Sequence, residues 1–85
     1  MDLFIHYTEL PRGKDLADVV GEINEVLDDH GAVCGGTIGR IDLELEDERI
    51  NPKYAQLAVK NYLQQAGFSR ETAIEIGGKE IGIYE

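Results

Sequence analysis

The sequence predicts one α+β domain over residues 1–85, with two helices on one face of an antiparallel sheet. Strand-like and helix-like segments follow one another in the order β-α-β-β-α-β-β. Two pairs of consecutive strand-like segments are joined by short turns that contain glycine, which is typical of hairpins and therefore of antiparallel pairing. Because 85 residues are too few for two separate cores, all elements are expected to share one.

The first strand and the first helix follow from residue type and spacing. Residues 3–8 are rich in aromatic and β-branched types and precede Pro11 and Gly13, which predicts a strand followed by a turn. Asp15 is expected to cap a helix near residues 15–30, with His30 in its last turn and Gly31 directly after it. Its apolar residues recur at steps of three and four: Leu16, Val19, Val20, Ile23, Val26 and Leu27.

The middle of the chain contains two strand-like runs, Ala32–Ile38 and Ile41–Glu46, joined at Gly39-Arg40. A tight hairpin is expected here, and one bent strand is the alternative. The second run alternates strictly between aliphatic residues and carboxylates. This alternation predicts a half-buried antiparallel strand with its three carboxylates on the other face.

A second helix is expected over residues 52–66, because Asn51-Pro52 is a typical helix start and Gly67 a typical end. Its predicted apolar stripe consists of Tyr54, Leu57, Ala58 and either Asn61 or Tyr62. Thr72–Ile76 and Glu80–Tyr84 then form a hairpin around Gly77-Gly78-Lys79. The complete order is that of the ferredoxin-like split β-α-β fold with one extra C-terminal strand.

These periodicities place one set of apolar residues in the core. The predicted members are Leu3 or Phe4, Ile5, Leu16, Val19, Val20, Ile23, Val26, Leu27, Ile41, Leu43, Leu45, Leu57, Leu63, Ile74, Ile76 and Ile83.

Charge and cysteine content limit the kinds of partner. The formal net charge is −9, from 17 acidic and 8 basic residues, and the basic residues are scattered along the chain. Nucleic acid and anionic membrane are therefore not expected as partners, whereas a basic protein is. The single Cys34 forms no internal disulfide, and neither a signal peptide nor a membrane-spanning run is evident, so a cytoplasmic location is expected.

The leading candidate site is the row of carboxylates Asp42, Glu44 and Glu46, which would project from one face of a strand about 7 Å apart. Glu75 would join it by the same alternation in the last hairpin. The row can be interpreted as a solvated face or as a surface that binds a protein. A metal or acid–base site would need carboxylates that converge in a pocket, so no metal site is predicted.

Two other features admit chemistry but favour a structural interpretation. The loop Gly35-Gly36-Thr37 resembles phosphate-binding loops only weakly, because a strand follows it rather than a helix; a β-bulge is expected instead. Cys34 could act as a nucleophile with His6 or His30, but no motif surrounds it, and we interpret it as a small core residue.

The sequence therefore favours a binding protein without cofactor or catalytic residues. Our hypothesis is a small acidic inhibitor that masks a basic partner, in the manner of bacterial immunity proteins and antitoxins. The alternative is a self-associating regulatory or small-ligand-sensing module, in which the sheet face or an edge strand mediates formation of a homodimer and the glycine-rich hairpin contacts the ligand. An enzyme acting through Cys34 or the carboxylates is a third hypothesis.

Overall fold

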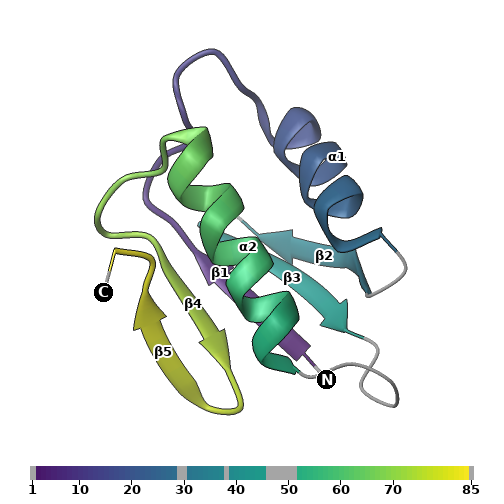
Figure 1. Cartoon of the computed structure of the whole chain (residues 1–85). Coiled ribbons are helices and arrows are strands. Elements are labelled where there is room, and N and C mark those ends of the chain that lie inside the picture. Colours follow the sequence, from purple (N-terminus) through teal and green to yellow (C-terminus); the bar gives the residue numbers. More distant parts are fainter. Residues whose placement is uncertain (1, 29–30, 38, 46–51, 85) are drawn as a thin grey trace.

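The computed structural model describes residues 2–28, 31–37, 39–45 and 52–84, with the backbone alone for 52–54. Its elements follow the predicted order (Figure 1). They are β1 (Asp2–His6), α1 (Leu16–Leu27), β2 (Gly31–Thr37), β3 (Arg40–Leu45), α2 (Pro52–Ala66), β4 (Ala73–Ile76) and β5 (Lys79–Gly82). The segment from Ala32 to Glu46 thus contains a hairpin and not one bent strand.

The strands form one sheet in the order β2-β3-β1-β4-β5, and every neighbouring pair is antiparallel. Both helices lie on the same face of this sheet (Figure 1). The predicted fold is therefore confirmed. The N-terminal strand β1 is central, while β2 and β5 are the two edges.

The core lies between the helices and the sheet face that they cover. Leu3 and Ile5 of β1 are fully buried, and their neighbours in β3 are the buried Leu43 and Ile41. The other predicted core residues that are buried are Val19, Ile23, Leu27, Leu45, Leu63, Ile74 and Ile83. Alternation along the strands thus predicted the buried face correctly.

Helix α1 begins as predicted but ends earlier. Asp15 and Asp18 form a reciprocal capping box, in which the Asp18 N–H donates to Asp15 Oδ1 at 2.9 Å. The helix ends at Leu27, so the prediction that Gly31 closes it is wrong; Gly31 begins β2 instead. A Cβ at Gly31 would lie 2.6 Å from the Glu44 carbonyl oxygen, so close strand packing explains this glycine. His30 lies outside the described residues.

The buried stripe of α1 is narrower than predicted. Val19, Ile23 and Leu27 are buried, but Leu16 and Val26 are 45% and 36% exposed. Val20 is half-buried, as is Ile76 of β4. The prediction that Leu16 and Val26 belong to the core is therefore wrong: the sheet covers only residues four apart, the closest neighbours along one face of a helix.

The predicted stripe of α2 is wrong at Leu57, although Tyr62, which it also contained, is half-buried and packs against the core. The helix buries Ala55, Val59 and Leu63, whereas Leu57 is 55% exposed. Two residues span about 200° of a helix, so Leu57 lies opposite the face that Ala55 and Val59 occupy. The sequence prediction followed the larger side chain of Leu57 and therefore selected the wrong face of the helix. Packing against the sheet decides which face is buried. The side chains of Asn51 and Tyr54 lie outside the described residues.

The segment after α2 completes the core in a way the periodicity did not predict. Phe68, Thr72 and Ala73 are buried, and the Phe68 ring packs edge-on against Tyr7, with 6.2 Å between ring centroids. The Ile83 N–H donates to the Thr72 carbonyl oxygen at 3.1 Å, which holds the end of the chain near the start of β4.

Glu22 connects the loop before α1 with both helices. Lys14 Nζ donates to its two carboxylate oxygens at 2.9 and 2.7 Å, and the Tyr62 hydroxyl donates to Oε1 at 3.0 Å. The hydrogen bond from Lys14 lowers the pKa of Glu22 below its usual value of 4.5. Burial, with Glu22 close by, raises the pKa of the Tyr62 hydroxyl, which stays protonated as the donor.

We expect Ile23→Ala to lower the free energy of unfolding by about 2–5 kcal/mol, because it removes a fully buried side chain. Leu57→Ala is the matched control on α2 and should cost less than about 0.5 kcal/mol, since Leu57 is exposed. Denaturant unfolding measures both values. Equal losses for the two variants would contradict the observed orientation of α2.

Lys14→Gln should raise the pKa of Glu22 toward 4.5, because the substitution removes the cation that stabilises the carboxylate. With the folded pKa lowered, this pair stabilises the protein above pH 4.5 and ceases to do so as pH falls through the folded pKa. NMR titration of the Glu22 carboxyl carbon measures the shift. Lys79→Gln, at the exposed first residue of β5, should leave the Glu22 pKa unchanged.

Candidate functional site

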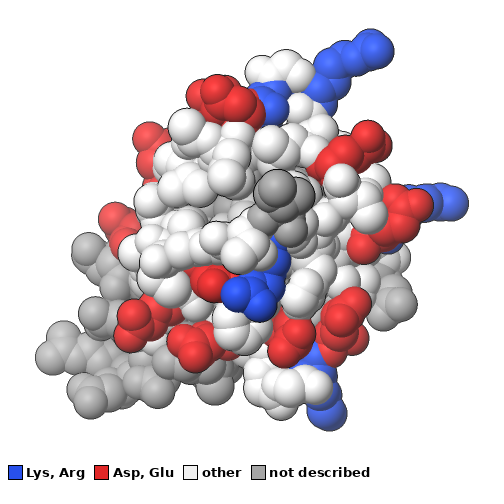
Figure 2. All heavy atoms as spheres, turned by 180° about the vertical axis from the view of Figure 1, so that it is seen from behind, with Lys and Arg blue, Asp and Glu red and all other residues white. Residues whose placement is uncertain are grey.

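The sheet face opposite the helices carries most of the charged groups that the sequence singled out. Because Ile41, Leu43 and Leu45 are buried, Asp42 and Glu44 project from the other side of β3. Figure 2 shows this open face, with acidic side chains distributed around its margin. The same alternation places Asp2, Phe4 and His6 of β1, Glu75 of β4 and Glu80 of β5 there. Glu46 lies outside the described residues.

Asp42 is neutralised by a neighbour on its own strand. Arg40 Nε donates to Asp42 Oδ1 at 2.7 Å, and a terminal guanidinium nitrogen donates to Oδ2 at 3.3 Å. The same guanidinium lies over the Phe4 ring, 5.4 Å from the ring centroid. At the Asp42 end of the predicted carboxylate row, the surface therefore also carries a guanidinium and an aromatic ring.

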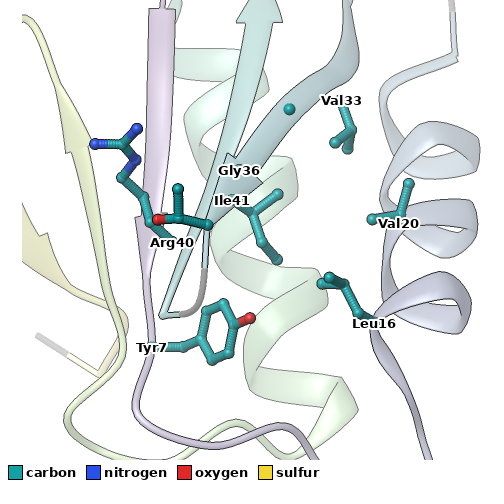
Figure 3. A pocket seen from close by; sticks show the side chains of 9 residues that line it. Tyr7, Leu16, Val20, Val33, Gly36, Arg40 and Ile41 are labelled. Atoms are coloured by element: carbon teal, nitrogen blue, oxygen red, sulfur yellow. The ribbon is translucent and has the colours of Figure 1, made fainter.

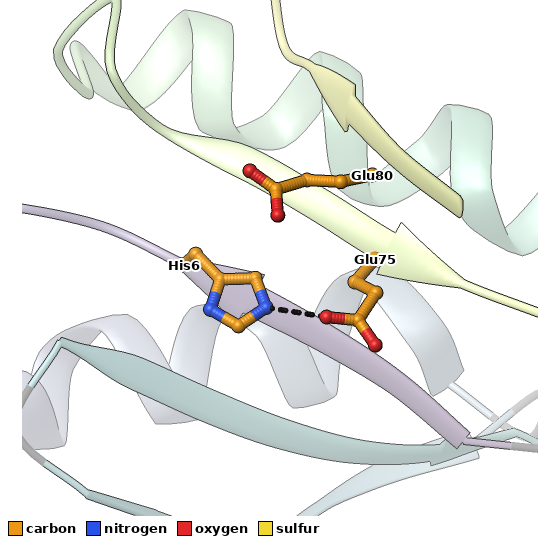
Figure 4. A group of neighbouring side chains, drawn as sticks. All are labelled: His6, Glu75 and Glu80. Atoms are coloured by element: carbon orange, nitrogen blue, oxygen red, sulfur yellow. Dashed lines mark hydrogen bonds and ion pairs between the residues drawn. The ribbon is translucent and has the colours of Figure 1, made fainter. Parts of the chain in front are cut away.

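Glu75 is paired as well, but with a residue far away in the sequence. His6 Nε2 lies 2.9 Å from Glu75 Oε1, and Glu80 completes a group whose ligand atoms all lie within 4.8 Å of one another (Figure 4). An imidazole and two carboxylates are suitable ligands for Zn²⁺. The hydrogen bond between His6 and Glu75 already explains why these two side chains lie together, without a metal ion. Glu80 was missed, although hairpin pairing with Glu75 could have indicated it.

Three carboxylates of the open face make no ion pair with any described residue: Asp2, Glu44 and Glu80. Each of them faces another carboxylate across a strand pair, because Asp2 and Glu44 are Cα partners and Glu80 is the Cα partner of Glu75. Like charges directly opposite each other destabilise a sheet. The open face thus retains unbalanced negative charge where the strands meet.

A second feature is a mainly apolar pocket of about 430 Å³ between α1 and the β2–β3 hairpin (Figure 3). Its lining residues are Tyr7, Leu16, Val20, Val33, Gly35, Gly36, Thr37, Arg40 and Ile41. The Arg40 guanidinium points away from the pocket, toward Asp42 on the open face. Apart from the hydroxyls of Tyr7 and Thr37, side chains therefore contribute apolar surface.

The pocket exists because β2 offers glycines where α1 presents apolar side chains. Gly36 has a φ of 154°, and a Cβ on it would lie 2.6 Å from the Arg40 carbonyl oxygen. A larger residue could not occupy this position unless β3 moved. The space facing Leu16 and Val20 is consequently unfilled, which is also why these two residues are not buried as predicted.

Cys34 lies in the β-bulge predicted near these glycines. Val33 pairs with Leu43 and Gly35 with Asp42, so Cys34 is the extra residue. Its thiol is exposed and lies 3.5 Å from the Asp42 carbonyl oxygen, so the prediction of a core position is wrong. Bulges turn a side chain out of the regular alternation, which explains the difference. His6 hydrogen-bonds to Glu75, and no described contact joins it to Cys34.

No family model, curated protein or solved structure matches this chain. Among the described residues, neither helix has the length and apolar character needed to cross a membrane. The two surfaces of the described residues that bear on function are the open face and the pocket.

Cys34→Ser should leave the free energy of unfolding within about 0.5 kcal/mol of the unmodified protein, because the thiol is exposed. In the native protein, a thiol reagent such as Ellman's reagent should react with Cys34 nearly as fast as in denaturant. Strong protection of the thiol, or a large loss of stability in the serine variant, would show instead that Cys34 packs inside.

Proposed function

We propose that this chain is a small acidic binding protein that masks a basic protein partner with the open face of its sheet. The observation that carries the proposal is the unpaired charge on that face. Asp2, Glu44 and Glu80 have no cation among the described residues, and like charges oppose one another across the strands. Lysine or arginine side chains of a partner would remove this repulsion and gain the ion pairs.

The centre of the open face supports the same proposal. Phe4 is half-buried and lies between Asp42 and Glu75 in the register of the sheet. Both of these carboxylates are held in place, by Arg40 and His6 respectively. An aromatic centre surrounded by oriented polar groups and an outer set of free charges resembles the anatomy of protein interfaces.

The overall charge supports rapid association with a basic partner. At −9 for 85 residues, the chain generates a negative field that attracts cationic surfaces and repels nucleic acid. Complementary charge of this kind chiefly raises the association rate and directs orientation. The proposed action is occlusion of the partner's functional surface, as immunity proteins and antitoxins do, without catalysis and without a cofactor.

A small-ligand-sensing module is a second candidate function, favoured by the pocket beside Gly35, Gly36 and Thr37. Its volume and mainly apolar lining are within the range of small-molecule sites. The two candidates predict different results: a ligand sensor would be stabilised by a small apolar molecule and would not depend on the open-face carboxylates.

Neutralising the unpaired carboxylates tests the proposed function. The variant Asp2→Asn/Glu44→Gln/Glu80→Gln should be as stable as the unmodified protein, or more stable by about 0.5 kcal/mol, because like-charge pairs are relieved. Its association with the partner, identified by affinity capture from the native host, should slow, and the dependence of the rate on salt should flatten. Stopped-flow measurements at low and moderate salt give both quantities.

The matched control is Glu9→Gln/Glu25→Gln/Glu71→Gln, which removes the same charge from exposed positions outside the sheet. It should slow association much less. If the two triple variants associate equally fast, net charge alone explains the attraction and the open face is not the interface.

A further inference from the structure

We infer that the second half of β2, Gly35–Thr37, and the adjacent pocket form a groove for an extended segment of the basic partner. The segment would pair with β2 as an added strand and insert an apolar side chain between β2 and α1. Its basic character rests on the proposed function above, whereas the groove rests on the geometry of β2 and α1.

Strand β2 is an edge of the sheet without the usual protection against pairing. Its seven residues, Gly31–Thr37, include no charged side chain, and charged side chains are a usual protection of sheet edges. The opposite edge, β5, is short and carries Lys79 and Glu80. The chain after β5 is also tied down, by hydrogen bonds from Tyr84 to the Phe68 carbonyl and from Gln64 to the Ile83 carbonyl. A new strand would therefore add at β2.

Only one half of β2 is free to pair with an added strand. On the first half, the Val33 N–H donates to Asn24 Oδ1 of α1 at 2.8 Å, so this edge group is already satisfied. The bulge at Cys34 then separates the two halves. Along Gly35–Thr37, alternate backbone groups face away from β3 and can bond to another chain.

The pocket lies beside this free half of β2, and only a side chain from another molecule could fill it. Leu16 and Val20 of α1 face it, and neither is buried. Gly36 cannot be replaced by a larger residue to fill it, because a Cβ would collide with the Arg40 carbonyl. Strand addition supplies both elements of recognition, backbone hydrogen bonds along the edge and a side chain for the pocket.

Charge decides between a basic segment and a second copy of this chain. Arg40, which lines the pocket, is paired with Asp42, and Lys14, two residues before Leu16, is paired with Glu22. Asp15 and Asp18 lie within two residues of Leu16 at the start of α1, and Glu44 is the Cα partner of the small Ala32. Two copies with a charge of −9 each repel one another, whereas a cationic segment is attracted.

Strand geometry then predicts the pattern of the segment. Alternate side chains of an added strand point to opposite faces of the sheet. One set points toward α1 and the pocket and is expected to be apolar. The other set points toward the open face, where Asp42 and Glu44 lie, and is expected to be lysine or arginine. The partner segment should therefore alternate between apolar and basic residues.

The test uses an acetylated and amidated heptapeptide of alternating lysine and leucine as the probe. In NMR titrations of the whole chain, amide shifts should be largest at Gly35–Thr37 and around Leu16, with backbone contacts between the peptide and β2. Leu16→Gln should weaken binding about tenfold or more, because it removes apolar contact from the pocket. Leu57→Gln, at a leucine of α2 that is also exposed, is the matched control and should bind as the unmodified protein does. Both variants should retain their unfolding midpoints.

Methylating alternate backbone nitrogens of the peptide should weaken binding by a similar factor, because it removes the bonds to β2. The inference is overturned if the parent peptide does not bind at millimolar concentration, or if Leu16→Gln and the methylated peptide bind as the parents do. It is also overturned if only Leu16→Gln weakens binding, which would indicate a pocket for small apolar ligands. A dimer in sedimentation equilibrium that Leu16→Gln dissociates would identify a second copy as the occupant.

The outcome is separable from that of the proposed function. The Asp2→Asn/Glu44→Gln/Glu80→Gln variant tests the open face with the natural partner, and Leu16→Gln leaves that face unaltered. If the triple carboxylate variant associates with the partner at the unmodified rate while the peptide binds as predicted, the open-face interface is rejected and the groove is retained. The reverse result would reject the groove alone.

Discussion

The arrangement of this protein depends on one-sided burial of the central strand. Leu3 and Ile5 of β1 are fully buried, and β3 and β4 present aliphatic partners to them from both sides. A shift of one residue in either pairing would move charged groups into the core, so the register is strongly specified. The same alternation fixes which carboxylates face outward. The position of the open-face charges is therefore a consequence of how the core is built.

Two kinds of charged group share the open face. Asp42 and Glu75 are held by Arg40 and by His6, which orients them but leaves little net attraction for a partner. Asp2, Glu44 and Glu80 make no ion pair with any described residue. The paired side chains thus have fixed positions, and the unpaired carboxylates generate a negative electrostatic field. Such a field favours fast and oriented association with a cationic surface.

The pocket between β2 and α1 depends on a glycine. Gly36 lets β3 approach more closely than a Cβ would permit, so no side chain from this position fills the space below α1. Leu16 and Val20 remain uncovered as a result. Because the groove adjoins the open face across β2 and β3, one extended basic partner could contact both surfaces.

Local pattern in the sequence determined the order of the elements, the Asp15 cap, the hairpins and the outward direction of Asp42 and Glu44. Each of these depends on neighbours within a few residues, so periodicity and turn chemistry suffice to predict them. Tertiary packing alone decided that α2 buries Ala55 and Val59 instead of Leu57, that Leu16 lines a pocket and that Cys34 is exposed. It also brought His6 to Glu75, 69 residues away. A helix can bury either of two faces and a bulge can reverse a strand's alternation, and only the surface packed against them selects the outcome.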